Sequence, residues 1–125
     1  MFAAWSIVLL KEVLDWYDAL GDEDTETAEL VGAAFDLLAQ EGPSLGRPLV
    51  DSIIGSRIGN LKEMRPASSS RSEIRILFVF DPQRQAIVLA AGDKAGRWSR
   101  WYRENIPIAE LRYDKWLAGG YDEEM

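Results

Sequence analysis

One arginine stands inside the strand that the sequence predicts most clearly. In the segment 73–80, EIRILFVF, strict alternation places Arg75 on the same face as Leu77, and both faces of the strand are otherwise apolar. An unpaired guanidinium there would cost several kcal/mol, so Arg75 must have a partner. That partner is either Glu63 or Glu73 in a structural ion pair, or an anion bound in a cleft.

Basic and aromatic side chains interleave over ten residues in the segment GDKAGRWSRWYREN. They are Lys94, Arg97, Trp98, Arg100, Trp101, Tyr102 and Arg103. Aromatic rings stack on bases and cations hold phosphates, so this composition suits single-stranded nucleic acid. Trp98, Trp101 and Tyr102 also have helical spacing, which would instead anchor a helix to the core, and for Trp101 we favour that interpretation.

The chain contains neither histidine nor cysteine. This excludes disulfides, thiolate chemistry, histidine metal ligands and any Ser-His-Asp or Cys-His pair, so acid–base chemistry must use Asp, Glu, Lys or Tyr. The acidic GDEDTE segment does not form a calcium loop, because the twelfth position counted from Asp22 is Ala33. We therefore expect no metal site and no cofactor.

Charge is unevenly distributed along the chain, whose formal net charge is −7. Residues 1–56 hold 2 basic and 11 acidic side chains, whereas residues 57–103 hold 10 basic and 4 acidic ones. The overall acidity argues against a general nucleic-acid binder. The basic middle segment predicts either a local phosphate-binding patch or ordinary solvated arginines on strand edges.

The N-terminal half predicts a strand followed by two amphipathic helices. A strand over 4–10 leads into a helix that Gly21 ends, and Asp22 or Asp24 caps a second helix that runs to Glu41. Gly-Pro at 42–43 stops this helix. The opening apolar run is too short for a membrane span and lacks the flanks of a signal peptide, so we expect a cytoplasmic protein.

The C-terminal half predicts strands and then short helices. A long connection over 42–57 would be pinned to the core by Leu45, Leu49, Ile53 and Ile54. Strands are expected at 60–65, 73–80 and 86–92, the last two as an antiparallel hairpin, with a polar loop at 66–72. The basic–aromatic segment is expected to be helical, and a second short helix is expected over 106–120. The residues of this second helix that would face the core are Ile108, Leu111 and either Trp116 or Leu117.

These elements fit one domain of 125 residues, 47% of them hydrophobic, in the α+β class. We expect residues 1–3 and 118–125 to be frayed termini.

The order of elements resembles the RelE/ParE superfamily of toxin–antitoxin toxins. The motifs LGRPLVDSIIGSR, NLKEMRP, SEIRILFVFDPQRQAIVLAAGDK and WYRENIP resemble its HigB-like, phage-associated branch, over residues 4–117. The resemblance implies a RelE-like fold with a small antiparallel sheet, an N-terminal two-helix hairpin and a short C-terminal helical segment. It also implies a metal-independent, ribosome-dependent mRNA endonuclease. Its partner would be a cognate antitoxin, which often carries a helix-turn-helix. The toxin would contact operator DNA only indirectly, through this antitoxin.

The resemblance also implies a site. Its catalytic positions match Lys62, Arg65, Arg75, Lys94 and Tyr102, and we expect RNA contacts from Arg57, Arg71, Arg97, Trp98 and Arg100. Such enzymes use the substrate's 2′-hydroxyl as nucleophile, so the protein supplies a base, an acid and charge stabilisation.

Arginines cannot deprotonate, so Arg65 and Arg75 would stabilise the transition state. Lys62 or Tyr102 would be the base, with the pKa of Lys62 lowered by the two arginines, and Lys94 or Arg97 would protonate the leaving oxygen or hold the phosphate.

Two other functions remain open. A ParE-like toxin would inhibit DNA gyrase by binding and perform no RNA chemistry, and Arg75 would then be structural. A degenerate member without activity could survive as an antitoxin-binding module, which the absence of histidine permits.

Overall fold

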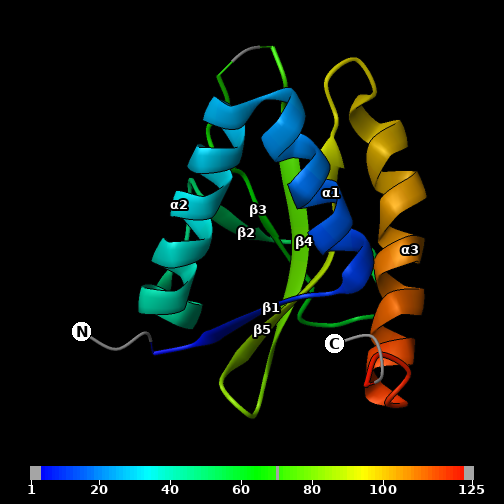
Figure 1. Cartoon of the computed structure of the whole chain (residues 1–125). Coiled ribbons are helices and arrows are strands. Elements are labelled where there is room, and N and C mark those ends of the chain that lie inside the picture. Colours follow the sequence, from blue (N-terminus) through cyan, green and yellow to red (C-terminus); the bar gives the residue numbers. More distant parts are fainter. Residues whose placement is uncertain (1–3, 70, 123–125) are drawn as a thin grey trace.

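The computed structural model describes residues 4–69 and 71–122, and its element order confirms the predicted α+β class (Figure 1). The N-terminal half contains β1 (Ser6–Leu9), α1 (Lys11–Glu23), α2 (Thr25–Glu41) and a 3-10 turn, η1 (Gly42–Ser44). The C-terminal half contains β2 (Val50–Ser52), β3 (Lys62–Met64), β4 (Ile74–Asp81), β5 (Gln85–Asp93) and α3 (Trp98–Leu117). No helix in this described part is long and apolar enough to cross a membrane.

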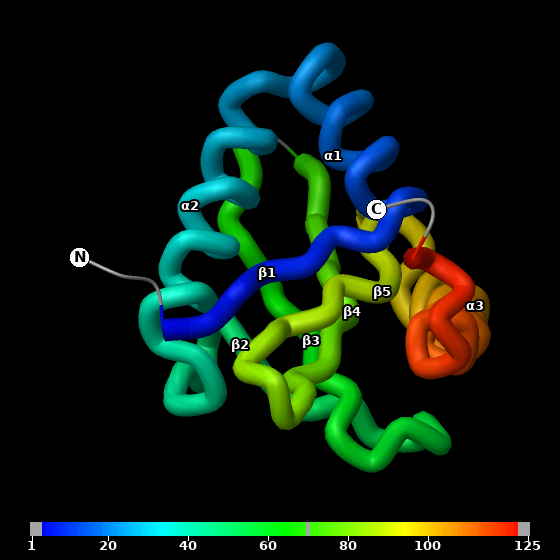
Figure 2. The backbone as a smooth tube through the Cα atoms, turned by 60° about the horizontal axis from the view of Figure 1, so that its bottom comes forward, coloured from blue at the N-terminus to red at the C-terminus, as the bar shows by residue number. Residues whose placement is uncertain are grey.

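The five strands form one sheet in the order β1-β5-β4-β3-β2. The predicted β4–β5 hairpin is confirmed, and β2, β3, β4 and β5 pair antiparallel. The predicted antiparallel sheet thus consists of these four strands, and β1 makes the whole sheet mixed because it lies parallel to β5. A parallel pair needs a long crossover, and here α1 and α2 carry the chain from the β1 edge across one face to the β2 edge (Figure 2).

Helices cover both faces of the sheet, so the protein has two cores. On one face, Val13, Val31 and Leu38 of the α1–α2 hairpin pack against Ile76 and Phe78. On the other, Trp101 and Ala109 of α3 pack against Leu77, Val79 and Leu89. The alternation of β4 therefore sends its even-numbered residues to the helical hairpin and its odd-numbered residues to α3.

The first helix extends beyond the predicted end at Gly21. It continues to Glu23, and the chain reverses at Asp24, whose extended backbone breaks the helix and whose carboxylate accepts the N–H of Thr27 at 3.1 Å. Asp24 is thus the cap of α2, one of the two candidates, because it satisfies an otherwise unpaired N–H of the first turn.

Gly42 ends α2 as predicted. Its φ of 57° lies in the left-handed region that favours glycine, and a Cβ there would lie 2.2 Å from Nε1 of Trp5. The connection after it holds the unpredicted strand β2. Leu45, Leu49 and Ile53 do pack on the cores, but Ile54 is 94% exposed, so its predicted anchoring role is wrong.

The basic–aromatic segment and the predicted last helix form one continuous helix, α3, with Pro107 inside it. The expected break is wrong because α3 packs along the sheet on both sides of the proline, through Trp101, Ala109 and Trp116. Trp101, 1% exposed, is a core residue as predicted, and Trp116 also faces inward. The continuous helix turns Ile108 and Leu111 to solvent, so their predicted burial is wrong, and of the alternatives Trp116 and Leu117 it is Trp116 that faces inward.

The chain after α3 is packed rather than frayed through residue 122. Tyr121 is buried, and its hydroxyl donates to Glu12 of α1 at 3.1 Å. The predicted fraying of 118–122 is therefore wrong, because the tyrosine returns the chain to the core. The remaining positions of that expectation, 1–3 and 123–125, lie outside the described residues.

Candidate active site

The site lies on the α3 side of the sheet, at the N-terminal end of that helix. Arg75 of β4 pairs with Gly92 of β5, and Glu63 of β3 pairs with Leu77, so both side chains belong to the face covered by α3. Gly92 permits a close approach here, since a Cβ at this position would lie 2.8 Å from Nε1 of Trp101. Trp101 thereby seats the first turn of α3 on β5 and brings Tyr102 over the sheet.

Glu63 is the buried centre of the site. Only 2% of the residue is exposed, and its Oε2 accepts the Tyr102 hydroxyl at 2.8 Å. Its Oε1 accepts Nε of Arg65 at 2.8 Å and a terminal nitrogen of the same guanidinium at 2.6 Å. This two-pronged contact raises the pKa of Arg65, although burial opposes the effect. Glu63 therefore fixes a permanent cation and a phenol in one place.

The environment of Tyr102 keeps its hydroxyl protonated. Burial raises the pKa of this phenol, the hydrogen bond to Glu63 raises it further, and only Arg75 acts in the opposite direction. At neutral pH Tyr102 is thus a hydrogen-bond donor, so it cannot serve as an ionised base. The proton that it carries can move only along its hydrogen bond to Glu63.

Arg75 lies beside this phenol without a carboxylate partner. Among residues 4–69 and 71–122 it forms no ion pair, so neither Glu63 nor Glu73 plays the structural role considered above. One terminal nitrogen donates to the carbonyl of Ile74 at 2.8 Å, while Nε is buried without a hydrogen-bond partner. A partly buried guanidinium with no carboxylate partner and one unsatisfied nitrogen is suited to bind an anion from outside the protein.

Lys94 completes the cluster from the loop before α3. It is 9% exposed, and its Nζ lies 4.7 Å from the ring centroid of Trp98 and 5.7 Å from that of Tyr102. In the described part of the chain Lys94 pairs with no carboxylate, and cation–π contacts hold its ammonium instead. Trp98 itself is 63% exposed, so its ring has a free surface.

Four of the five predicted catalytic residues, Arg65, Arg75, Lys94 and Tyr102, are thus gathered on one face. Lys62 is not, because it pairs with Phe78 and shares with Met64 the face covered by the α1–α2 hairpin. The sheet separates it from Arg65 and Arg75, so the predicted crowding by those two arginines does not occur. Side chains alternate along a strand, so the odd spacing between positions 62 and 65 already indicates that Lys62 and Arg65 lie on opposite faces.

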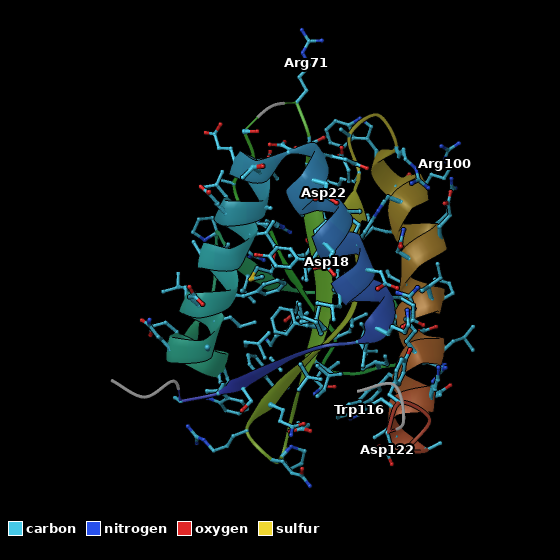
Figure 3. All side chains as sticks on the ribbon, viewed as in Figure 1. Asp18, Asp22, Arg71, Arg100, Trp116 and Asp122 are labelled. Atoms are coloured by element: carbon cyan, nitrogen blue, oxygen red, sulfur yellow. The ribbon has the colours of Figure 1, made fainter. Side chains whose placement is uncertain are left out.

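The predicted RNA-binding arginines are more dispersed. Arg71 projects from the tip of the β3–β4 loop, and Arg100 points outward from α3 (Figure 3). Arg100 and Arg97 both pair with Glu104, which neutralises part of their charge. Arg57 pairs with Asp114 at 2.6 Å, and this hydrogen bond raises its pKa. Arg57 therefore fastens its loop to α3 and is not an unpaired cation at the site.

The sequence predicts Glu63 only as a possible ion-pair partner of Arg75, not as a partner of Arg65 and Tyr102. The signal that could have revealed its actual partner is the spacing Glu63-x-Arg65 on a strand, which places both side chains on one face. The contact with Tyr102 spans 39 positions and has no local signal.

Comparison with known proteins shows the family of the chain. Residues 16–114 match the family described as "Phage derived protein Gp49-like". The chain belongs to this family. It is 54% identical over 109 residues to a Mycobacterium tuberculosis (strain ATCC 25618 / H37Rv) protein named "Putative toxin HigB2", and the match covers 87% of the chain and 53% of that protein.

A second protein of the same organism is named "Putative toxin HigB3". It is 52% identical over 113 residues, which are 90% of the chain and 94% of that relative. The chain thus corresponds to about half the length of one Gp49-like relative and nearly all of the other. The resemblance to HigB-like toxins is confirmed at the level of the family. No solved structure matches the chain significantly.

Proposed function

We propose that this Gp49-like protein is the toxin of a toxin–antitoxin pair and acts as a metal-independent endonuclease on mRNA in the ribosome. The observation that carries the proposal is Arg75, a partly buried cation with no carboxylate partner among the described residues, lying beside Tyr102 on the face that also holds Arg65 and Lys94. Arg75 and Lys94 have no carboxylate partner among the described residues, and Arg65, which is paired with Glu63, adds a third guanidinium or ammonium group on the same face, so the cluster suits a phosphate. The names of the two relatives support the toxin assignment.

The chemistry follows from the contacts of Tyr102. The RNA 2′-oxygen attacks the adjacent phosphorus as its proton passes to the Tyr102 oxygen, while the phenolic proton moves to Glu63 along the 2.8 Å hydrogen bond. Tyr102 thus relays the proton without ionising. Arg75 and Arg65 donate to the phosphorane oxygens, where negative charge develops.

The P–O5′ bond then breaks, and the leaving oxygen takes a proton from the Lys94 ammonium. The products are a 2′,3′-cyclic phosphate and a free 5′-hydroxyl. Lys94 fits this role better than Arg97, because a lysine can release its proton and Arg97 is paired with Glu104.

The exposed ring of Trp98 provides a surface on which a base next to the scissile phosphate can stack. Arg71 and Arg100, which project outward from the β3–β4 loop and from α3, would contact the RNA backbone (Figure 3). A cognate antitoxin that presents acidic side chains would cover the same cations and block the site. Because the substrate is translated mRNA, we place the protein in the cytoplasm.

Primer extension on a reporter mRNA after brief induction tests the proposal. We expect new 5′ ends within translated codons for the wild-type chain, and their loss in Arg75→Ala. Arg84→Gln is the matched control, since Arg84 is an exposed arginine in the β4–β5 turn, and it should cut like the wild type. Intact mRNA with growth arrest would indicate a gyrase inhibitor instead, and intact mRNA without arrest an inactive binding module.

A further inference from the structure

A pocket of about 280 Å³ opens beside Tyr102, on the flank of α3 that faces the loop after β2. Its lining consists of Gly55, Tyr102, Arg103, Ile106, Pro107 and Glu110. Tyr102 belongs both to this pocket and to the cluster that it forms with Arg65, Arg75 and Lys94. The pocket therefore adjoins the site proposed for the phosphate.

The wall opposite α3 is held in a fixed position. Ser56 donates its hydroxyl, and Arg57 its backbone N–H, to Oε2 of Glu110, each at 2.8 Å. The Arg57 side chain also donates to both oxygens of Asp114. The loop around Gly55 is thus fastened to α3 at two carboxylates, so the pocket is preformed.

The pocket offers apolar surfaces and two charged side chains, the donor Arg103 and the acceptor Glu110. Ile106, Pro107 and the ring of Tyr102 supply the apolar walls. Both hydrogen bonds to Glu110 go to Oε2, whereas the nearest cation to Oε1, Nε of Arg57, is 3.9 Å away, beyond hydrogen-bonding distance. The N–H of Arg57 and the hydroxyl of Ser56 lower the pKa of Glu110, so it is ionised at neutral pH and can only accept.

We propose that this pocket binds a nucleobase adjacent to the scissile phosphate and selects bases that carry an exocyclic amino group over uracil. An amino group of adenine, cytosine or guanine can donate to Oε1 of Glu110 while the ring lies against Pro107 and Ile106. Uracil has only an N–H flanked by two carbonyl oxygens, and those oxygens would face a carboxylate. This inference rests on the proposed nuclease function and adds a sequence preference to it.

The direct test measures binding of uncleavable 2′-deoxy oligonucleotides to the purified chain by fluorescence anisotropy. The four bases are varied at one position at a time. We expect one position at which uracil weakens binding about tenfold relative to the amino-bearing bases. Equal affinity for all four bases at every position would overturn the inference, and this measurement requires no variant.

Glu110→Gln then tests the acceptor. A carboxamide can both accept and donate, so the uracil penalty should disappear while binding of the other bases changes by less than about threefold. Asp114→Asn is the matched control, since it alters the second carboxylate of the same contact and should keep the preference. Retention of the preference in Glu110→Gln would assign it to another residue.

The two proposals fail differently. If the folded wild-type chain binds none of the oligonucleotides and cuts no mRNA, the nuclease proposal fails and the pocket inference with it. If it binds or cuts in an Arg75-dependent way without base preference, only the pocket inference fails.

Discussion

Tyr102 donates its hydroxyl to Oε2 of Glu63 at 2.8 Å, although the two residues are 39 positions apart in the chain. The contact links the first turns of α3 to strand β3, on the face of the sheet that α3 covers. On its other oxygen Glu63 holds Arg65. One buried carboxylate therefore positions two of the groups that we expect to contact the substrate.

Removal of this carboxylate should cost stability. Glu63→Ala leaves the Tyr102 hydroxyl and the Arg65 guanidinium without their main acceptor, so we expect the free energy of unfolding to fall by about 2 kcal/mol. Urea denaturation measures the loss. Glu104→Ala is the control, because Glu104 also pairs with two arginines but at the surface, and should change stability by less than about 0.5 kcal/mol. Equal losses in both variants would contradict this account.

The phenol of Tyr102 should titrate later than an ordinary tyrosine. Its pKa in the folded state is raised by burial and by Glu63, whereas in the unfolded chain it is about 10. The stability that depends on the neutral phenol is therefore complete below pH about 10 and is lost as the pH rises through the folded-state pKa.

A titration of tyrosinate absorbance at alkaline pH measures the pKa of Tyr102, and the Tyr102→Phe variant identifies its signal. We expect the variant to lack one tyrosine that titrates above the ordinary value. If the difference between wild type and variant titrates at or below the ordinary value, the proposed protonation state of Tyr102 is wrong.

Arg75 should not be needed for the stability of the fold. Arg75→Met retains the apolar length of the side chain and removes a buried, unpartnered nitrogen, so the free energy of unfolding should stay the same or rise by about 1 kcal/mol. Nuclease activity should fall at least about 100-fold in the same variant. Thermal denaturation and primer extension measure the two effects. A large loss of stability would return Arg75 to a structural role.

The backbone of Trp98 should be strained. Its φ of 39° lies in the left-handed region, which a bulky residue adopts at a cost of order 1–3 kcal/mol. Trp98→Gly and Trp98→Ala both remove the ring, but only glycine accepts this conformation freely. We expect the glycine variant to be more stable than the alanine variant by about 1 kcal/mol, the reverse of the usual order in helices. Urea denaturation of the pair decides the sign.

The contact of Arg57 with α3 should open in acid. The pKa of Asp114 is lowered by its hydrogen bond with Arg57, and that of Glu110 by the Arg57 N–H and the Ser56 hydroxyl. Their contribution is thus present above the unfolded-state values near pH about 4 and is lost as the pH falls through the lower folded-state values.

Hydrogen exchange of the Arg57 amide, which Glu110 accepts, reports this opening. We expect its protection to disappear in acid before that of β4, and Arg57→Gln to lose part of it at neutral pH. Simultaneous loss of protection in the loop and in β4 would mean that the contact has no local role.

Much of the fold follows from local sequence. Alternation in 73–80 and the apolar stripes of the two N-terminal helices fix these elements, since burial period and turn residues act over a few positions. The family is also predicted from contiguous motifs, among them LGRPLVDSIIGSR and SEIRILFVFDPQRQ. The cations at the site come from the motifs NLKEMRP, SEIRILF and AAGDK.

Local sequence did not determine which of these residues meet. Lys62 and Glu63 are neighbours in the chain, yet register with β4 sends Lys62 to the hairpin face and Glu63 to Tyr102. The phase of α3 likewise depends on Trp101 seated over Gly92, which decides that Tyr102 faces the sheet and Leu111 the solvent. The sequence alone determined the residue types and the elements that carry them. Only tertiary structure decided their partners, because strand register and helix phase are set by contacts between distant segments.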